Sequence, residues 1–251
     1  MTKIIAILNH KGGVGKTTTS INLSAALQQK KKQVMVIDFD GQANLTESFG
    51  YSIEEPKTIY GAMKGEYPLP AIKTPSGITL VPSCLDLSAA ESELINEPGR
   101  EMILKSLINK YEDSSKFDYI LIDCPPSLGL LTLNALTAAD IVIIPVQAQF
   151  LAMRGMAKIM NVIQLVKERL NPKLRIGGIV ITQFDKRKSL NKSVSELIKD
   201  SFCDKVFKTI IRDNVSLAEA PIEGKNIYEY KKNSNGAKDY LSLAKEVMQL
   251  K

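Results

Sequence analysis

The chain has 251 residues, 44% hydrophobic and 24% charged, a balance that excludes a disordered or fibrous protein. The formal net charge is +6, but residues 1–150 carry 13 basic against 16 acidic side chains (−3), while residues 151–251 carry 20 against 11 (+9). No apolar run reaches the ~18 residues that a membrane-spanning helix needs, and no secretion signal opens the chain. Three widely spaced cysteines, Cys84, Cys124 and Cys203, favour a reducing compartment over a disulfide framework, so we expect a cytoplasmic protein.

Apolar strands and helical patterns alternate along the chain. In order, the sequence predicts a strand at 4–9, a helix at 16–30, a strand at 34–38, an irregular excursion at 51–75, and strands at 78–82 and 119–123. A helix at 131–139, a strand at 141–146, a helix at 154–170, a strand at 176–181, a helix at 192–202, a strand at 206–211 and a helix at 236–250 follow. Strands that are apolar end to end predict an α/β fold with a doubly wound, mainly parallel sheet and helices on both faces. No linker divides the chain, so we expect one domain over residues 1–251.

A glycine-rich segment, N-H-K-G-G-V-G-K-T-T-T at residues 9–19, follows the first strand and opens the first helix. Gly12, Gly13 and Gly15 permit backbone conformations in which successive N–H groups turn toward phosphate oxygens. The helix adds its free N–H groups and the positive end of its dipole. This context of strand, glycine loop and helix predicts a phosphate-binding loop (P-loop).

The side chains of this segment suit ATP and Mg²⁺. Lys16 offers a charge to the β- and γ-phosphates, and Thr17 offers a hydroxyl to the metal ion. The general pattern G-x-x-x-x-G-K-[ST] is not fully met, because His10 takes its first position and an additional lysine, Lys11, precedes the glycines. We expect His10 to pack beneath the turn. The predicted nucleotide-binding residues are Lys11, Gly12, Gly13, Val14, Gly15, Lys16, Thr17 and Thr18.

Aspartates stand at the ends of two predicted strands. Asp123 ends Y-I-L-I-D and fits a carboxylate on the magnesium side of the site, while Asp38 and Asp40 end V-M-V-I-D-F-D. A carboxylate at the latter end can orient the attacking water in line with the γ-phosphate. Each aspartate alone could simply cap a helix, but three of them around one loop favour a nucleotide-hydrolysing site.

Several ordered motifs resemble the ParA/Soj family of chromosome- and plasmid-partitioning ATPases, within the MinD-like deviant Walker A group. K-G-G-V-G-K-T-T at residues 11–18 looks like the deviant Walker A motif, and D-F-D-G-Q-A-N at 38–44 is similar to D-x-D-P-Q-x-N. I-D-C-P-P-S at 122–127 is similar to the Walker B stretch, and L-A-E-A-P-I-E-G-K at 217–225 to L-S-E-A-P-x-x-G-x. The closing helix at 236–246 also fits, so the resemblance spans essentially the whole chain.

The resemblance implies a slow ATPase that works as a switch. Lys11 would be the signature lysine that reaches across an ATP-dependent homodimer to the partner's phosphates, and residues 211–221 would line the adenine. Asp40 would orient the water, so the catalytic residues would be Lys11, Lys16 and Asp40, and the metal residues Thr17, Asp38 and Asp123. Gly41 replaces the family's proline, and we expect a looser turn there.

The resemblance also implies partners. ATP dimers of such proteins bind double-stranded DNA without sequence preference, so we expect a nucleoid-associated protein stimulated by a ParB-like centromere-binding protein. Arg187 matches one DNA-binding position, but Ser216 stands where a second arginine is expected. Arg212 and Lys225, with Lys231 and Lys232, lie near in sequence and are the candidates to replace it. The +9 half of the chain fits a polyanionic partner, although a solvated lysine-rich surface explains the charge equally well.

Two other functions remain open. A MinD-like switch would need an amphipathic C-terminal membrane anchor, but residues 236–250 read better as a core-packing helix, so we expect no membrane partner. An electron-transfer ATPase like the nitrogenase iron protein would need two cysteines around a cluster, and Cys84 and Cys124 lack the glycine-rich surroundings of that family.

Overall fold

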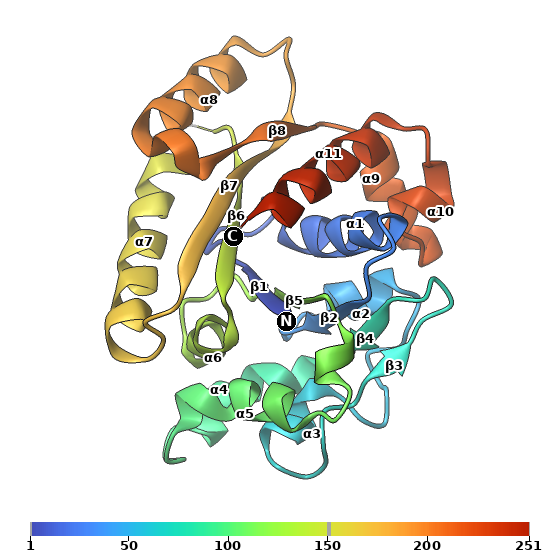
Figure 1. Ribbon diagram of the computed structural model, residues 1–251, viewed down its shortest axis with the longest axis vertical. Coiled ribbons are helices and arrows are strands. Elements are labelled where there is room, and N and C mark those ends of the chain that lie inside the picture. The colour runs from blue at the N-terminus through green and yellow to red at the C-terminus, as the bar shows by residue number, and fades with distance from the viewer. Residues whose placement is uncertain (1, 150–151, 251) are drawn as a thin grey trace.

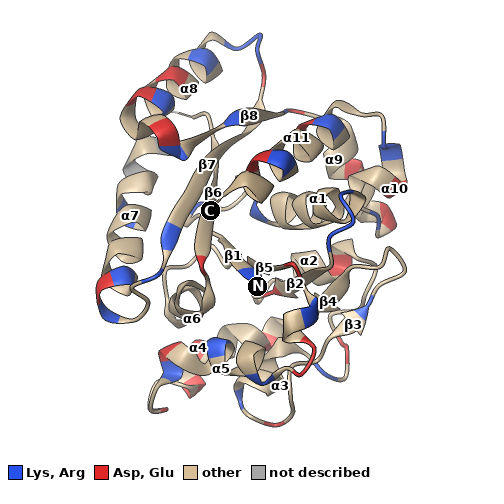
Figure 2. Ribbon diagram, viewed as in Figure 1, with Lys and Arg blue, Asp and Glu red and all other residues tan. Residues whose placement is uncertain are grey.

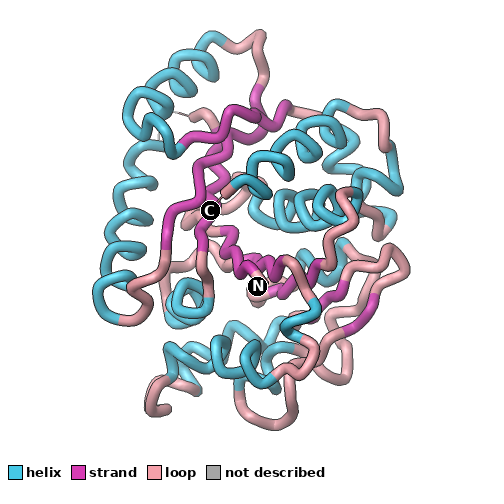
Figure 3. The backbone as a smooth tube through the Cα atoms, viewed as in Figure 1, coloured by secondary structure: helices cyan, strands magenta, loops and turns pink. Residues whose placement is uncertain are grey.

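A computed structural model describes residues 2–149 and 152–250, and an eight-stranded sheet runs through it (Figures 1 and 3). The strand order is β3-β4-β2-β5-β1-β6-β7-β8, and every neighbouring pair is parallel except β3 and β4. The strands are β1 (Lys3–Ile7), β2 (Val34–Asp38), β3 (Ile72–Lys73), β4 (Thr79–Val81), β5 (Tyr119–Asp123), β6 (Ile141–Gln147), β7 (Arg175–Phe184) and β8 (Val206–Arg212). The predicted α/β fold with a mainly parallel sheet is therefore confirmed.

Helices cover both faces of the sheet, and each face has its own buried apolar cluster. One face carries α1 (Lys16–Gln29), α2 (Asn44–Ser48), α9 (Val215–Glu219), α10 (Ile227–Lys231) and α11 (Asn235–Gln249). The other carries α3 (Ile59–Met63), α4 (Ala90–Glu93), α5 (Ile103–Lys110), α6 (Leu130–Ala138), α7 (Ala152–Arg169) and α8 (Ser189–Phe202). Figure 1 shows α1 and α11 side by side on the first face. None of the helices described is both long and apolar enough to cross a membrane.

The strand order determines which strand ends meet. Strand β5 lies between β1 and β2, and its last residue, Asp123, is in register with Ile7 on one side and Asp38 on the other. The chain turns from one half of the sheet to the other around β1, which lies between β5 and β6. In sheets of this kind ligands bind beyond the carboxyl ends of the strands at such a switch point. The loop after β1 lies at this position.

Every strand and helix predicted from the sequence is present, with ends that differ by at most a few residues. The excursion at 51–75 contains the short helix α3 and the two-residue strand β3. Short helices α2, α4, α9 and α10, the eight-residue α5, and 3₁₀ turns were not predicted. The 3₁₀ turns lie at Leu85–Ala89, Arg100–Met102, Ser114–Lys116, Cys203–Lys205 and Ala220–Glu223.

The outer edge of the sheet at β8 is covered by carboxylates of α11. Glu246 accepts hydrogen bonds from the backbone N–H groups of Lys208 and Thr209, each at 2.8 Å. Asp239 accepts from the N–H of Arg212 at 3.0 Å. Helix α11 itself buries Tyr240 and other apolar residues against α1 and β8, so the C-terminal helix packs in the core as expected.

Candidate functional site

The loop between β1 and α1 has the backbone form that the glycines predict. Gly13 and Gly15 have φ values of +73° and +87°, in the left-handed region that favours glycine. Thr182 Oγ1 donates to the carbonyl of Val14 at 2.7 Å, and Gln183 Nε2 donates to that of Gly13 at 2.8 Å. Because a carbonyl and the next N–H point in opposite directions across a planar peptide, these bonds turn the following N–H groups away from β7. The loop thus presents donors at the start of α1.

Two lysines flank the loop. Lys16 is only 7% exposed, and its Nζ lies 3.3 Å from the backbone carbonyl of Lys11. The backbone N–H of Lys11 donates to Asn9 Oδ1 at 3.0 Å, while its side chain reaches across to Gln149 Oε1. The Lys16 ammonium therefore lies inside the loop, whereas the Lys11 ammonium lies against the segment after β6.

Asp38 and Asp123 lie side by side at the carboxyl ends of the neighbouring strands β2 and β5. Both are buried, and their backbones are register neighbours. Asp38 Oδ2 accepts from the N–H and hydroxyl of Thr46 at 2.8 and 2.7 Å. Asp123 Oδ1 accepts from Ser20 Oγ at 2.9 Å, but its Oδ2 is buried and forms no hydrogen bond to any residue that the structure describes.

Burial makes this carboxylate pair costly to ionise. Loss of solvent and the neighbouring Asp123 raise the pKa of Asp38 to about 8. Burial raises the pKa of Asp123 to about 7, against the opposing effects of the Thr17 and Ser20 hydroxyls and the Lys16 ammonium. Two adjacent buried carboxylates become ionised readily only beside a cation, so the pair fits a divalent metal ion.

The unpartnered Oδ2 of Asp123 is a further sign that the site is built for a metal ion. Within residues 2–149 and 152–250, no three His, Cys, Asp or Glu side chains are arranged to hold a metal by themselves. A metal ion here would therefore need oxygen ligands from elsewhere, as Mg²⁺ at a P-loop takes from phosphates and water. Thr17, Asp38 and Asp123 are the residues that would hold it.

Asp40 lies two residues after β2, beyond the carboxyl end of that strand. It is half-buried, and its Oδ1 accepts from the N–H of Gln42 at 3.1 Å. The looser turn expected at Gly41 is wrong. Gly41 is buried under the Leu85–Ala89 turn, and a Cβ there would lie 2.1 Å from Ser88 Oγ and 2.9 Å from Ser88 N, so glycine permits a close approach.

A cavity of about 140 Å³ opens beside the loop. Gly15 and Thr18 form its loop side, and the segment after β8 forms the opposite side. The predicted adenine-lining segment at 211–221 contributes most of that opposite side. The cavity is lined by Gly15, Thr18, Thr182, Gln183, Ile211, Arg212, Asp213, Asn214, Leu217, Ala218 and Tyr240.

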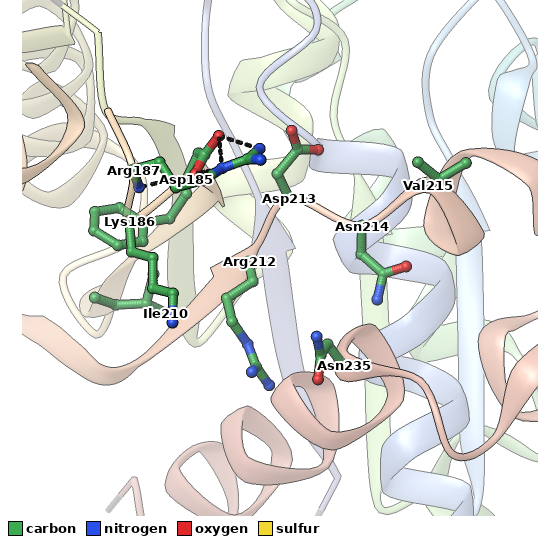
Figure 4. Close-up of a pocket in the computed structure, with 10 residues that line it drawn as sticks. Asp185, Lys186, Arg187, Ile210, Arg212, Asp213, Asn214, Val215 and Asn235 are labelled. Carbon is green, nitrogen blue, oxygen red and sulfur yellow. Dashed lines mark hydrogen bonds and ion pairs between the residues drawn. The ribbon is translucent and has the colours of Figure 1, made fainter. Parts of the chain in front are cut away.

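The predicted DNA-binding residues fall into two places. Arg187 and Arg212 share a groove of about 600 Å³ between the ends of β7 and β8 (Figure 4), whereas Lys225 lies outside it, paired with Glu223 at 2.7 Å. Ser216, at the expected arginine position, is buried in α9 and offers no surface charge. The structure thus brings two of the three residues together.

Each groove arginine is already paired within the chain. Arg187 is 84% exposed and contacts Asp185 at 2.8 Å, and its guanidinium lowers the pKa of that carboxyl to about 2. Arg212 makes a two-pronged pair with Asp239, the shorter contact being 2.6 Å. Figure 2 shows basic and acidic residues interspersed along α8 and α11. The C-terminal half is therefore basic in sum, with acidic residues placed among the basic ones along these helices.

Several residues that shape the site were not predicted. Asn9, Ser20, Thr46, Thr182 and Gln183 hold the loop or its carboxylates through the hydrogen bonds described above, and Asn9 Nδ2 also donates to the Pro145 carbonyl at 2.7 Å. Only Asn9 and Ser20 are near the loop in sequence, so the others could be found only once the strand order was known.

His10 packs against α7, close to the expected arrangement beneath the turn. A Cβ on Gly155 of α7 would lie 2.3 Å from His10 Cε1, so a larger residue at 155 would force the ring to move from its present position. Burial and the nearby Lys158 and Lys16 lower the pKa of His10. The buried Nδ1 has no hydrogen-bond partner among the described residues.

Comparison with known proteins agrees with this geometry. The family model described as an AAA domain matches residues 2–176. Sporulation initiation inhibitor protein Soj of Bacillus subtilis is 44% identical over 251 residues, covering 98% of both chains. Chromosome partitioning protein ParA of Myxococcus xanthus is 42% identical, covering 98% of this chain and 88% of the relative.

Solved structures match over the same length. A protein of Mycobacterium smegmatis named cobyrinic acid a,c-diamide synthase, with bound ADP and magnesium, superposes with a TM-score of 0.87 at 34% identity, covering 99% of this chain and 95% of that one. A putative plasmid partition protein of Borrelia burgdorferi bound to AMPPNP gives 0.84 at 30%, covering 99% of each chain. The septum site-determining protein MinD of Pyrococcus horikoshii with Mg-ADP gives 0.81 at 26%, covering 100% and 97%. The fold is that of the P-loop NTPases of the ParA and MinD type, and by its full-length relatives the chain belongs to the ParA/Soj family of partitioning proteins.

Proposed function

We propose that the protein is a DNA-segregation ATPase whose ATP-bound homodimer binds DNA without sequence preference and leaves it after hydrolysis. The observation that carries the proposal is the site at the ends of β1, β2 and β5. There a glycine loop presents N–H donors, Lys16 is buried within the loop, and a buried aspartate pair needs a cation. Relatives bound to ADP with magnesium and to AMPPNP support ATP and Mg²⁺ as its ligands.

The roles of the side chains follow from their positions. Gly12 to Thr18 would surround the phosphates, with Lys16 offsetting their charge. Bound Mg²⁺ would neutralise charge that develops on the β- and γ-phosphate oxygens. Asp40, which is less buried than Asp38, would act on the attacking water through orientation more than through basicity, and we expect intrinsic hydrolysis to be slow.

Lys11 supports the dimer. Two triphosphates buried face to face repel each other, and a lysine from each subunit offsets that repulsion. The ammonium of Lys11 lies outside its own loop, against Gln149, rather than among the donors of the phosphate site. Nucleotide would then be part of the interface, so that loss of the γ-phosphate dissolves the dimer.

The groove of Arg187 and Arg212 supports DNA as the partner, together with the +9 charge of residues 151–251. In this scheme the protein works in the cytoplasm on the nucleoid. A ParB-like centromere-binding protein would stimulate turnover, as expected for the family.

The test is electrophoretic mobility of duplex DNA with wild type and Asp40→Ala, each with ATP, ADP and no nucleotide. We expect retardation only with ATP, decreasing steeply as salt rises from 50 to 200 mM, about the range over which phosphate contacts lose most of their strength. Failure of the Asp40→Ala variant to retard DNA with ATP would rule out the proposal.

A MinD-like membrane switch is the alternative. It shares the fold, so only the C-terminal helix discriminates, and α11 buries Tyr240, Leu243 and Val247 in the core instead of leaving an apolar face for lipid. Co-flotation with anionic liposomes in the presence of ATP would favour the alternative.

A further inference from the structure

The side chains of Lys11 and Gln149 are in contact within one subunit. Lys11 is the lysine proposed to act on the partner subunit's nucleotide, yet here its Nζ donates to the side-chain Oε1 of Gln149 in its own subunit. Both residues are partly buried. A phosphate across the interface would compete with Gln149 for the donors of this ammonium.

The segment that leads to Gln149 is held by hydrogen bonds. The carbonyl of Ala148 accepts from Asn191 Nδ2 at 2.9 Å, and the N–H of Gln149 donates to the Gln147 carbonyl at 2.8 Å. The side chain of Gln147 in turn donates to Gln183 at 2.6 Å. Gln149 is therefore offered to Lys11 from a held backbone, which lowers the entropic cost of the contact.

The loop that carries Lys11 is tied to the same strand. Asn9 bridges the two, because its Oδ1 accepts from the N–H of Lys11 and its Nδ2 donates to the carbonyl of Pro145 in β6. The distance between the lysine and glutamine backbones is thus set by β1 and β6, neighbours in the sheet.

The chemistry of the acceptor makes the contact reversible. Gln149 is neutral, and Lys11 forms no ion pair with any carboxylate of the described residues. A neutral amide binds an ammonium more weakly than a carboxylate or phosphate does. A triphosphate brought close by a second subunit would therefore outcompete it.

We infer that Gln149 is a positioning residue that holds Lys11 in its own subunit and releases it when an ATP-bound partner docks. This inference rests on the proposed function, since it presupposes the ATP-dependent dimer. It makes Gln149 a determinant of how readily the dimer forms. Its effect is on assembly and not on nucleotide binding to the single subunit.

The test compares wild type, Gln149→Ala and Gln149→Glu by sedimentation velocity with Mg²⁺ and AMPPNP. In Gln149→Ala, the protein concentration at which half of the subunits are dimeric should fall by about tenfold, because the two Lys11–Gln149 contacts that each dimer must break are absent. In Gln149→Glu, the same concentration should rise by a similar factor, because a carboxylate binds Lys11 more tightly than an amide does. Gln164→Ala is the matched control, since this exposed glutamine donates to Glu168 on the same helix, α7, and it should leave dimerisation unchanged. ADP affinity should be equal in all four proteins.

The opposite signs separate a positioning role from damage to the fold, which would weaken dimerisation in both variants. A wild-type dimer that neither substitution shifts, or that both weaken, overturns the inference alone. A wild-type protein that stays monomeric with AMPPNP overturns the proposed dimer and the inference together.

Discussion

The phosphate-loop site and the groove between β7 and β8 both lie at the carboxyl ends of the strands, but the charged side chains of the first are buried and the arginines of the second are exposed. In the first, Lys16, Asp38 and Asp123 are buried, and oxygen or nitrogen partners surround most of their polar atoms. In the second, Arg187 and Arg212 are partly or mostly exposed, each already paired with an aspartate. A buried charge tolerates no substitution without a large cost, whereas an exposed pair contributes about 0–1 kcal/mol and can be exchanged.

This difference explains why the two regions are unequally marked in the sequence. The loop keeps every motif residue except the first glycine, and its backbone is held by Thr182 and Gln183 while Lys16 is buried. Near the groove, Ser216 of α9 stands where an arginine is expected, and it is buried, so it offers no charge at the surface.

Substitution of Lys16 should have the largest effect. Lys16→Ala should weaken ATP binding by about a hundredfold or more, because the triphosphate loses a charged partner in a buried place. Isothermal titration with ATP and Mg²⁺ measures the change, with the exposed Lys110→Ala as the matched control. Affinity equal to wild type would show that the phosphates bind elsewhere.

Asp40→Ala should reduce ATP hydrolysis by about a hundredfold while leaving ATP binding intact, since orientation of the water is lost but no phosphate contact is removed. The ATP dimer should then persist for longer than in wild type, which light scattering after ATP addition would follow. Only monomer in that experiment would contradict the assignment of Asp40.

Replacement by alanine should have different effects at the two groove arginines. Arg187→Ala should lower DNA affinity by about threefold to tenfold and leave thermal stability and dimerisation unchanged, because its side chain is almost free of the core. Arg212→Ala should also destabilise the fold by about 1 kcal/mol, since Asp239 is only 10% exposed and would lose its cation.

Mobility shifts and thermal melting of the same preparations check this. Unaltered DNA affinity in Arg187→Ala would place the DNA surface outside the groove. Lys225→Ala, at a site away from the groove, is the comparison that then shows whether that residue takes over.

The smallest expected effect concerns protons. Because the folded-state pKa values of Asp38 and Asp123 are raised to about 8 and 7, the metal-free protein holds extra protons between about pH 4 and pH 8. The stability from these groups is complete below pH 4 and is lost as the pH rises through 7 to 8. Binding of Mg²⁺ with nucleotide favours the ionised forms, so it should release protons and strengthen as the pH rises through that window.

Calorimetry at pH 7 in two buffers of different ionisation enthalpy measures this proton release, which should be roughly one to two protons. Asp38→Asn should reduce it, and the exposed Asp86→Asn should not. Equal heats in both buffers for wild type would mean that the aspartate pair is already ionised without metal.

The longer elements could be predicted because their apolar residues repeat over many positions. Strands β2 and β5 matched to the residue, since each is buried along its whole length, follows a polar residue and ends at an aspartate. Short helices such as α2 have no such repeat. Helix α2 starts at Asn44, directly after Ala43 with its φ of +51°, and is held by bonds from Thr46 to Asp38, a contact that exists only in the folded chain.

Some residues of the site could likewise be predicted from the sequence, and others could not. The positions of the loop, Asp38 and Asp123 follow from motifs at strand ends, because parallel strands bring those ends together. Thr182, Gln183 and Gln149 act on the loop from more than a hundred residues away, and only the placement of β6 and β7 beside β1 reveals them. The close approach of Ser88 to Gly41 was equally hidden, since the Leu85–Ala89 turn has no sequence pattern of its own.

The carboxylates of α11 on β8 bear on how the molecule behaves when crowded. An outermost strand normally displays unused N–H groups to which the strand of another molecule can attach. Here Glu246 and Asp239 occupy those of Lys208, Thr209 and Arg212, so an incoming chain would have to displace two anions before pairing. High local concentrations of the protein should therefore not lead to aggregation by strand pairing at β8.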